Sequence, residues 1–184
     1  MPEHDQRIAA LRATAHPVRL RMLSLLTGSA MSAAEVAREL GLTHANASYH
    51  LRVLHDVGEI VEAGEERIRG GTAKRYRYPY ERALAEPPDP ARPRATPEER
   101  VVYVRAVAGE LERRIREQSG RARHSDLEGW VAPEVWTEAC RLLEEASRLL
   151  HEANRAPRTP GTIHVNATTW AFEMTSDPAE KKAP

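Results

Sequence analysis

The sequence predicts a mainly α-helical protein that carries a small β wing. Three observations support this fold class. Two short amphipathic helical patterns separated by a glycine occupy residues 32–58. A glycine-rich basic segment with strand-like alternation follows at 59–79, and two long amphipathic patterns lie between 96 and 156. Aromatic residues make up only 5% of the chain, while Ala, Leu, Glu and Arg are abundant, which also favours helices.

Composition divides the 184 residues into four parts. Residues 1–83 are predicted to form the first domain. Residues 84–97 contain five prolines and little to bury, so they are predicted to be a stiff, extended linker. Residues 98–156 form a two-helix region, and residues 157–184 form a strand-like tail with a disordered end.

The first domain has clear helix start and stop signals. Pro17 suits a first helical position, and the apolar residues that follow it have helical spacing as far as Gly28. Ser32 and Glu35 form a capping box, in which each side chain bonds to the other's backbone amide. Gly41 then ends the second helix, because a tight turn needs a residue without a side chain.

The next helix is predicted from about Thr43 to Gly58. Its apolar residues Ala47, Leu51, Leu54 and Val57 lie four, three and three residues apart, so they form one buried stripe. The helix-turn-helix pattern is thus followed by two segments, 59–63 and 73–79, whose side chains alternate in character as they do in β-strands.

These two segments flank Gly64, Gly70 and Gly71, so they predict a hairpin, or wing. The order of the elements is that of a winged helix-turn-helix domain. In this fold the second helix of the motif lies in the major groove of DNA, with its N-terminal residues at base edges.

The face of residues 43–58 opposite the buried stripe points outward. Most of its side chains can hydrogen-bond to bases or phosphates, and none is a large aliphatic. An exposed polar face without any partner is the alternative, but the capped helix, the Gly41 turn and the basic wing favour DNA. The predicted DNA contacts of this helix are Thr43, His44, Ala45, Asn46, Ser48, Tyr49 and Arg52.

Basic side chains are concentrated in the wing although the whole chain is neutral, with 27 Lys and Arg against 27 Asp and Glu. A local basic patch is sufficient for phosphate contact. The alternative is a run of solvated charges. The predicted wing contacts are Arg67, Arg69, Lys74 and Arg75.

The stretch "LGLTHANASYHLRVLHDVGEIVE" resembles the core signature of ArsR/SmtB-type winged-helix regulators. "TAHPVRLRMLSLL" resembles the opening helix of that family, and "RGGTAKRYRY" resembles its wing. The resemblance covers about residues 8–80. The matching core positions are Leu42, Thr43, Ser48, His50, Leu51, Leu54, Gly58, Ile60 and Val61. The resemblance implies a bacterial, dimeric transcription regulator, usually a repressor that an inducer releases from DNA.

The metal-sensing members of this family differ from this chain. They carry a Cys-x-Cys-Asp stretch where this chain has Ala33, Ala34 and Glu35, and the second family metal site has no counterpart here. Cys140, the only cysteine, lies three helical turns from His151, which is too far for one metal ion. We therefore expect no metal and no cofactor. His50 is predicted to pack or to position the backbone, and His44 either approaches DNA or is solvated.

The C-terminal half is predicted to contain two helices with wide apolar stripes. The first has Thr96 as its cap, and the second begins near Pro133. Such stripes must pack on each other, on the first domain or across a two-fold axis, and recognition of two half-sites favours a homodimer. The predicted dimer residues are Val101, Val104, Ala108, Leu111, Val135, Ala139, Leu142, Ala146 and Leu149.

The tail alternates apolar residues at 163, 165 and 167, so residues 161–170 are predicted to be a short strand whose edge needs a partner. Four aromatic residues lie in this region: Tyr103, Trp130, Trp136 and Trp170. They either line a pocket for a small-molecule effector or pack in an ordinary hydrophobic core, and core packing is the favoured interpretation.

Several functional classes are disfavoured. The chain has no apolar run of membrane-spanning length and no signal-peptide pattern, so we expect a cytoplasmic protein with no membrane partner. It has no nucleophile elbow, phosphate-binding glycine loop or paired catalytic carboxylates, so we expect no enzyme. The sequence predicts a DNA-binding transcriptional repressor; the alternative is a winged helix that binds only proteins.

Overall fold

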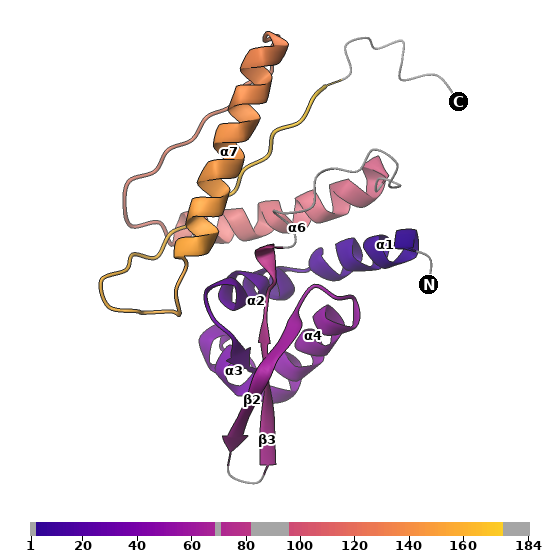
Figure 1. Cartoon of the computed structure of the whole chain (residues 1–184), viewed down its shortest axis with the longest axis vertical. Coiled ribbons are helices and arrows are strands. Elements are labelled where there is room, and N and C mark those ends of the chain that lie inside the picture. The colour runs from indigo at the N-terminus through magenta and orange to yellow at the C-terminus, as the bar shows by residue number, and fades with distance from the viewer. Residues whose placement is uncertain (1–2, 69–70, 82–95, 175–184) are drawn as a thin grey trace.

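The computed structural model describes residues 3–68, 71–81 and 96–174. Its lower part in Figure 1 is the winged domain, and two long helices lie above it. The predicted linker at 84–97 falls outside the described residues except for its last two, and so does the tail end from 175 onward.

The winged domain contains four helices: α1 (Glu3–Thr14), α2 (Pro17–Gly28), α3 (Ala33–Leu40) and α4 (His44–Asp56). The three predicted helices are confirmed, with Pro17 in the first turn of α2. The side chain that caps α2, that of His16, was not predicted, and neither was helix α1.

The predicted helix-turn-helix signals are also confirmed. The Oγ of Ser32 accepts the Glu35 amide at 3.4 Å, and the Glu35 carboxylate accepts the Ser32 amide at 2.7 Å. Gly41 has a φ of 65°, a left-handed conformation in which a side chain would be strained. The turn between α3 and α4 therefore follows directly from local sequence.

The apolar faces of these helices meet in one core beneath the sheet. Its largest fully buried side chains come from α2, α3, α4 and the turn after α4. They are Met22, Leu26, Val36, Leu51, Leu54 and Ile60. Three of the four residues of the predicted α4 stripe are buried, and Val57, beyond the end of α4, is half-buried.

The wing is part of a three-stranded antiparallel sheet made of β1 (Met31–Ser32), β2 (Val61–Ile68) and β3 (Gly71–Arg77), in the order β1-β3-β2. The β2–β3 hairpin was predicted, whereas the two-residue strand β1 was not. Met31 pairs with Tyr76, and the β2–β3 register shifts between Glu62 and Glu65. The fold is a winged helix.

Helix α6 (Pro97–Arg116) lies across α1 and α2. Its N-terminus has the predicted Thr96 cap, within a complete capping box. Two of its contacts with the winged domain are polar: Glu99 pairs with Arg12 at 3.5 Å, and Arg114 donates to the Ser24 Oγ at 3.4 Å.

Helix α7 (Pro133–Ala153) projects away from the winged domain and touches it near its own C-terminal end (Figure 1). The carbonyl of Arg155, just beyond α7, lies so close to Gly28 that a Cβ there would approach its oxygen to 2.4 Å. The His151 ring lies 5.3 Å from the Tyr80 ring. Among the described helices, none is long and apolar enough to cross a membrane.

The predicted strand at 161–170 is wrong. The described tail contains no strand; it runs as extended chain beside α7 (Figure 1). Its contacts are made by side chains, such as Trp136 Nε1 donating to Glu173 at 3.1 Å. Alternation of apolar residues indicates an extended chain, but a strand also needs a neighbouring edge, and the described sheet consists only of β1, β3 and β2.

Candidate nucleic-acid interface

Helix α4 is fixed in orientation by the residues that it buries. Ala47, His50, Leu51 and Leu54 all lie in the interior, so the opposite face of the helix must point to solvent. The Oγ1 of Thr43 accepts the Asn46 amide at 3.2 Å and so defines the start of the helix. Local capping and core packing together present the N-terminal turn of α4 outward.

The structure brings the seven predicted contacts of this helix to one surface. Six are exposed and Ser48 is half-buried. Within the described part of the chain, the side chains of His44, Asn46 and Arg52 have no hydrogen bond or ion pair. Tyr49 is 56% exposed, and its ring meets that of His50 edge-on at 5.2 Å. These polar groups are available to a ligand.

The start of α4 also suits an anion. The first backbone amides of a helix lack intrahelical partners and carry the positive end of the helix dipole. In α4 the Thr43 side chain engages the Asn46 amide and the Thr43 carbonyl accepts the Ala47 amide at 3.0 Å, while the exposed residues His44 and Ala45 form the first turn. A DNA phosphate is an anion that such a turn can bind.

The wing cations differ in their surroundings. Arg67 is exposed and makes no ion pair with any described residue, whereas Lys74 donates to Glu62 at 2.6 Å. Arg69 lies outside the described residues. Contact of Arg67 and Lys74 with phosphate stays a prediction. To bind a DNA phosphate, Lys74 would have to break its ion pair with Glu62.

Arg75 is the most enclosed of the predicted wing cations that the structure describes, with a side chain 27% exposed. It lies 3.0 Å from Glu35 and 2.6 Å from Glu66, and it donates to the Ala30 carbonyl at 2.6 Å. These contacts join the wing to the capping box of α3. Its predicted phosphate contact is untested, but the arrangement gives Arg75 a structural role that the sequence did not reveal, because Glu35 is forty residues away.

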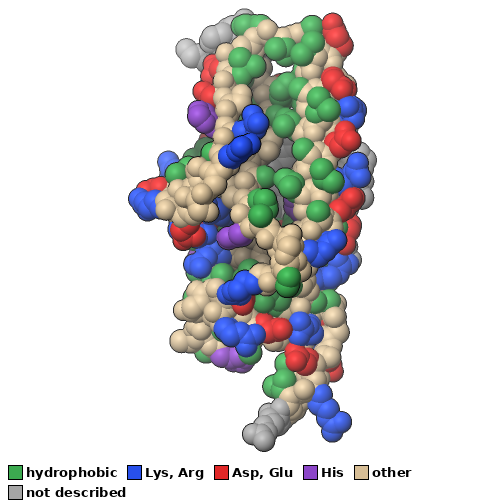
Figure 2. Space-filling model, turned by 90° about the vertical axis from the view of Figure 1, so that its left-hand side faces the viewer, with side chains coloured by type: hydrophobic (Ala, Val, Ile, Leu, Met, Phe, Trp, Pro, Cys, Tyr) green, Lys and Arg blue, Asp and Glu red, His purple; other side chains and the backbone are tan. Residues whose placement is uncertain are grey.

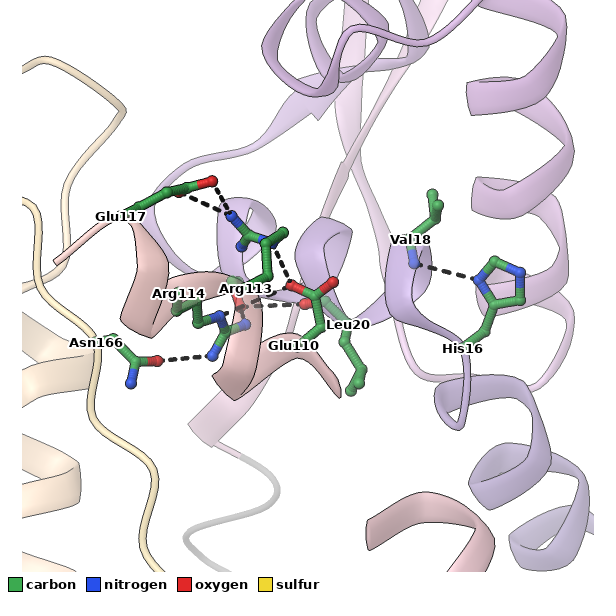
Figure 3. A network of polar contacts seen from close by, with 9 residues as sticks. His16, Val18, Leu20, Glu110, Arg113, Arg114, Glu117 and Asn166 are labelled. Carbon is green, nitrogen blue, oxygen red and sulfur yellow. Dashed lines mark hydrogen bonds and ion pairs between the residues drawn. The ribbon is translucent and has the colours of Figure 1, made fainter. Parts of the chain in front are cut away.

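Behind the exposed face of α4, two histidine rings lie 4.9 Å apart. His16 Nδ1 accepts the Val18 amide at 3.2 Å, as Figure 3 shows. His50 is only 7% exposed, and its Nδ1 has no hydrogen-bond partner in the described structure. Burial lowers the pKa of both histidines, and the positive charge of Arg19 lowers them further. His50 thus packs, as predicted.

This arrangement predicts a stability that depends on pH. Because the native pKa values of His16 and His50 lie below the ordinary value of 6.5, the unfolded chain binds protons more readily as the pH falls through that range. The free energy of unfolding should therefore be highest above pH 6.5 and should decrease as the pH is lowered. Urea unfolding between about pH 5 and pH 7.5 measures the effect.

The control compares two histidines of the same helix. His50→Leu should weaken the pH dependence, because an unpartnered buried ring is replaced by an apolar side chain. His44→Leu, at an exposed position, should leave it unchanged. Equal slopes in the wild type and His50→Leu would show that His50 does not contribute.

A second polar network connects the tail to the winged domain (Figure 3). The carboxylate of Glu110, a residue only 4% exposed, lies 3.0 Å from Arg113 Nε and 3.9 Å from Arg114 Nε. Arg114 also donates to Asn166 of the tail at 2.7 Å and to Ser24 of α2. Glu110, Arg113 and Arg114 are neighbours within α6, but Ser24 and Asn166 join them only through the tertiary fold. The sequence therefore did not reveal this network.

The predicted dimer residues lie on exposed surface for the most part. Of the α6 set, Val101 and Ala108 are exposed, and Val104 and Leu111 are half-buried. In the α7 set only Ala139 is half-buried. The exposed members on α7 are Val135, Leu142, Ala146 and Leu149.

A family model described as a helix-turn-helix domain matches residues 14–62, from the end of α1 through α2, α3 and α4 to the start of the wing. No curated protein matches the chain. The helix-turn-helix domain indicates a DNA-binding regulator of transcription, with DNA as its partner.

Proposed function

We propose that this protein is a sequence-specific transcriptional repressor that binds its DNA operator as a homodimer and does not act as an enzyme. The observation that carries the proposal is the N-terminal face of α4, where unpaired hydrogen-bonding side chains are exposed on a helix anchored in the core. Asn46 and Tyr49 read bases, while Ser48, Arg52 and the first-turn amides position the helix on phosphates.

The homodimer follows from how such helices read DNA. Two reading helices held about one turn of the duplex apart recognise two half-sites, and a two-fold axis provides that spacing. Repression, and release by a small-molecule effector, rest on the resemblance to ArsR/SmtB-type regulators. The alternative, a module that binds only proteins, is not favoured, because Tyr49 is the only large side chain with apolar character among the seven predicted contacts on α4.

The experiment that tests the proposal is selection of binding sites from genomic fragments, followed by titration against salt. The full chain should enrich a sequence with two related half-sites, and its affinity should fall steeply as salt rises, because phosphate contacts release counterions. Recovery of fragments without a common sequence, or an affinity that salt does not change, would contradict the proposal.

The wing is tested in the same titration. Arg67→Ala should lower affinity for the selected site and for random DNA alike, and should reduce the salt slope by about 1 for each copy. Arg123→Ala is the matched control, because Arg123 is an exposed arginine far from the wing in the chain. If both variants reduce the slope equally, only net charge matters and Arg67 makes no local contact.

A further inference from the structure

Helix α7 is amphipathic over its whole length, yet none of its residues is buried. Along one side, Val135, Leu142 and Leu149 are 55%, 50% and 64% exposed. Half-buried residues of α7 lie mainly on the side next to this stripe, including Cys140 and His151, and Ala139 is the half-buried member of the stripe side itself. The apolar stripe of a soluble helix normally faces a core, so this stripe lacks its partner.

The charged side of α7 needs no partner. Arg141 pairs with Glu138 at 2.8 Å and with Glu145 at 2.9 Å, and Arg148 pairs with Glu152 at 3.5 Å. These pairs lie within the helix and neutralise one another. The missing partner of α7 must therefore offer apolar surface and not opposite charge.

Two extended segments, residues 118–132 and 163–174, run on either side of α7 (Figure 1). Both carry further exposed apolar side chains. Trp130 is 85% exposed and Ile163 is 84% exposed. Figure 2 shows apolar side chains gathered around a hollow in the upper part of the molecule, with Arg and Glu side chains along an outer edge.

The size of this surface is what a stable interface needs. Thirteen large apolar residues between 127 and 174 are each between 38% and 85% exposed. At about 150 Å² for a fully exposed side chain, the lower end of the aromatic range, they leave on the order of 1,000 Å² in contact with water. The largest patch on a typical monomer is roughly 300–600 Å², and each partner in a stable complex contributes roughly 800 Å².

We propose that α7 and its two extended segments form the interface with a second copy of this chain. The stripe of Val135, Leu142, Ala146 and Leu149 meets the same stripe of the other copy across a two-fold axis. The stripe of the second copy has the same length and apolar character. In this arrangement the charged side of each α7 stays in contact with water. The inference rests on the proposed homodimer and assigns its contact surface to α7.

The association of the full chain in sedimentation equilibrium tests the interface. Leu142→Glu with Leu149→Glu should raise the dimer dissociation constant by about 100-fold or more, because each copy would bury two unpaired carboxylates. The matched control is Arg148→Glu with Glu152→Arg, which reverses an ion pair on the charged side and should leave the dimer intact. A wild type that stays monomeric, or a Leu variant that stays dimeric, would overturn the inference.

Crosslinking gives a second readout that does not depend on how the Glu variant folds. In a Cys140→Ser background, Ala146→Cys should be joined between copies by a bismaleimide, while Glu144→Cys, on another side of α7, should not. Equal crosslinking of the two positions would exclude the stripe. A dimer that forms through α7 but selects no DNA site would refute the proposed function and leave this interface standing.

Discussion

Replacing Asn46 and Tyr49 together by alanine should reduce the preference for the selected DNA site over random DNA by about 100-fold, because each lost base contact is worth about 1–3 kcal/mol of discrimination. The fold should survive, since the Asn46 side chain has no partner in the described structure and Tyr49 is 56% exposed. Competition binding against unrelated DNA measures the change.

Asp56→Ala is the control for this experiment. Asp56 lies at the C-terminal end of the same helix and is also exposed, so its removal should leave site preference unchanged. If the double variant at Asn46 and Tyr49 still selects the same site, α4 is not the helix that reads bases. Unchanged dimerisation of all three proteins in sedimentation would show that only recognition was altered.

Leu54→Ala should have the largest effect on stability. Leu54 is 0% exposed and packs in the core of the winged domain, so its truncation should lower the free energy of unfolding by about 2–5 kcal/mol. Its carbonyl also accepts the Glu59 amide at 3.0 Å, at the turn that leads from α4 into the wing. Urea denaturation followed by circular dichroism measures the loss.

Arg52→Ala, two residues earlier on the exposed side of α4, separates stability from binding. It should change the free energy of unfolding by less than about 0.5 kcal/mol. At the same time it should weaken DNA binding, because Arg52 is a predicted phosphate contact. A loss of stability as large as that of Leu54→Ala would mean that the exposed side of α4 packs against something.

Helices α2, α3 and α4 and the turn between α3 and α4 could be predicted because their determinants are local. Ser32 and Glu35, three residues apart, form their capping box, and Gly41 ends α3 in the conformation that glycine favours. The α4 stripe is likewise set by spacing within one helix. The exposed face of α4 follows from that stripe.

What could not be predicted depends on residues far apart in the chain. Arg75 meets Glu35, and His16 meets His50, only after the helices have packed. Neither partner is marked by any spacing in the sequence. The tail shows the opposite error: its alternation indicates an extended chain, but pairing depends on an edge that the fold does not bring near it.

The close approach of the Arg155 carbonyl to Gly28 joins the base of α7 to the C-terminal end of α2. Helix α7 extends about 30 Å beyond this joint, since each of its 21 residues adds about 1.5 Å. A rotation of ~10° at the joint would therefore displace the far tip by about 5 Å. In a dimer held through α7, the angle at Gly28 sets the distance between the two reading helices, and with it the spacing of half-sites that the protein can span.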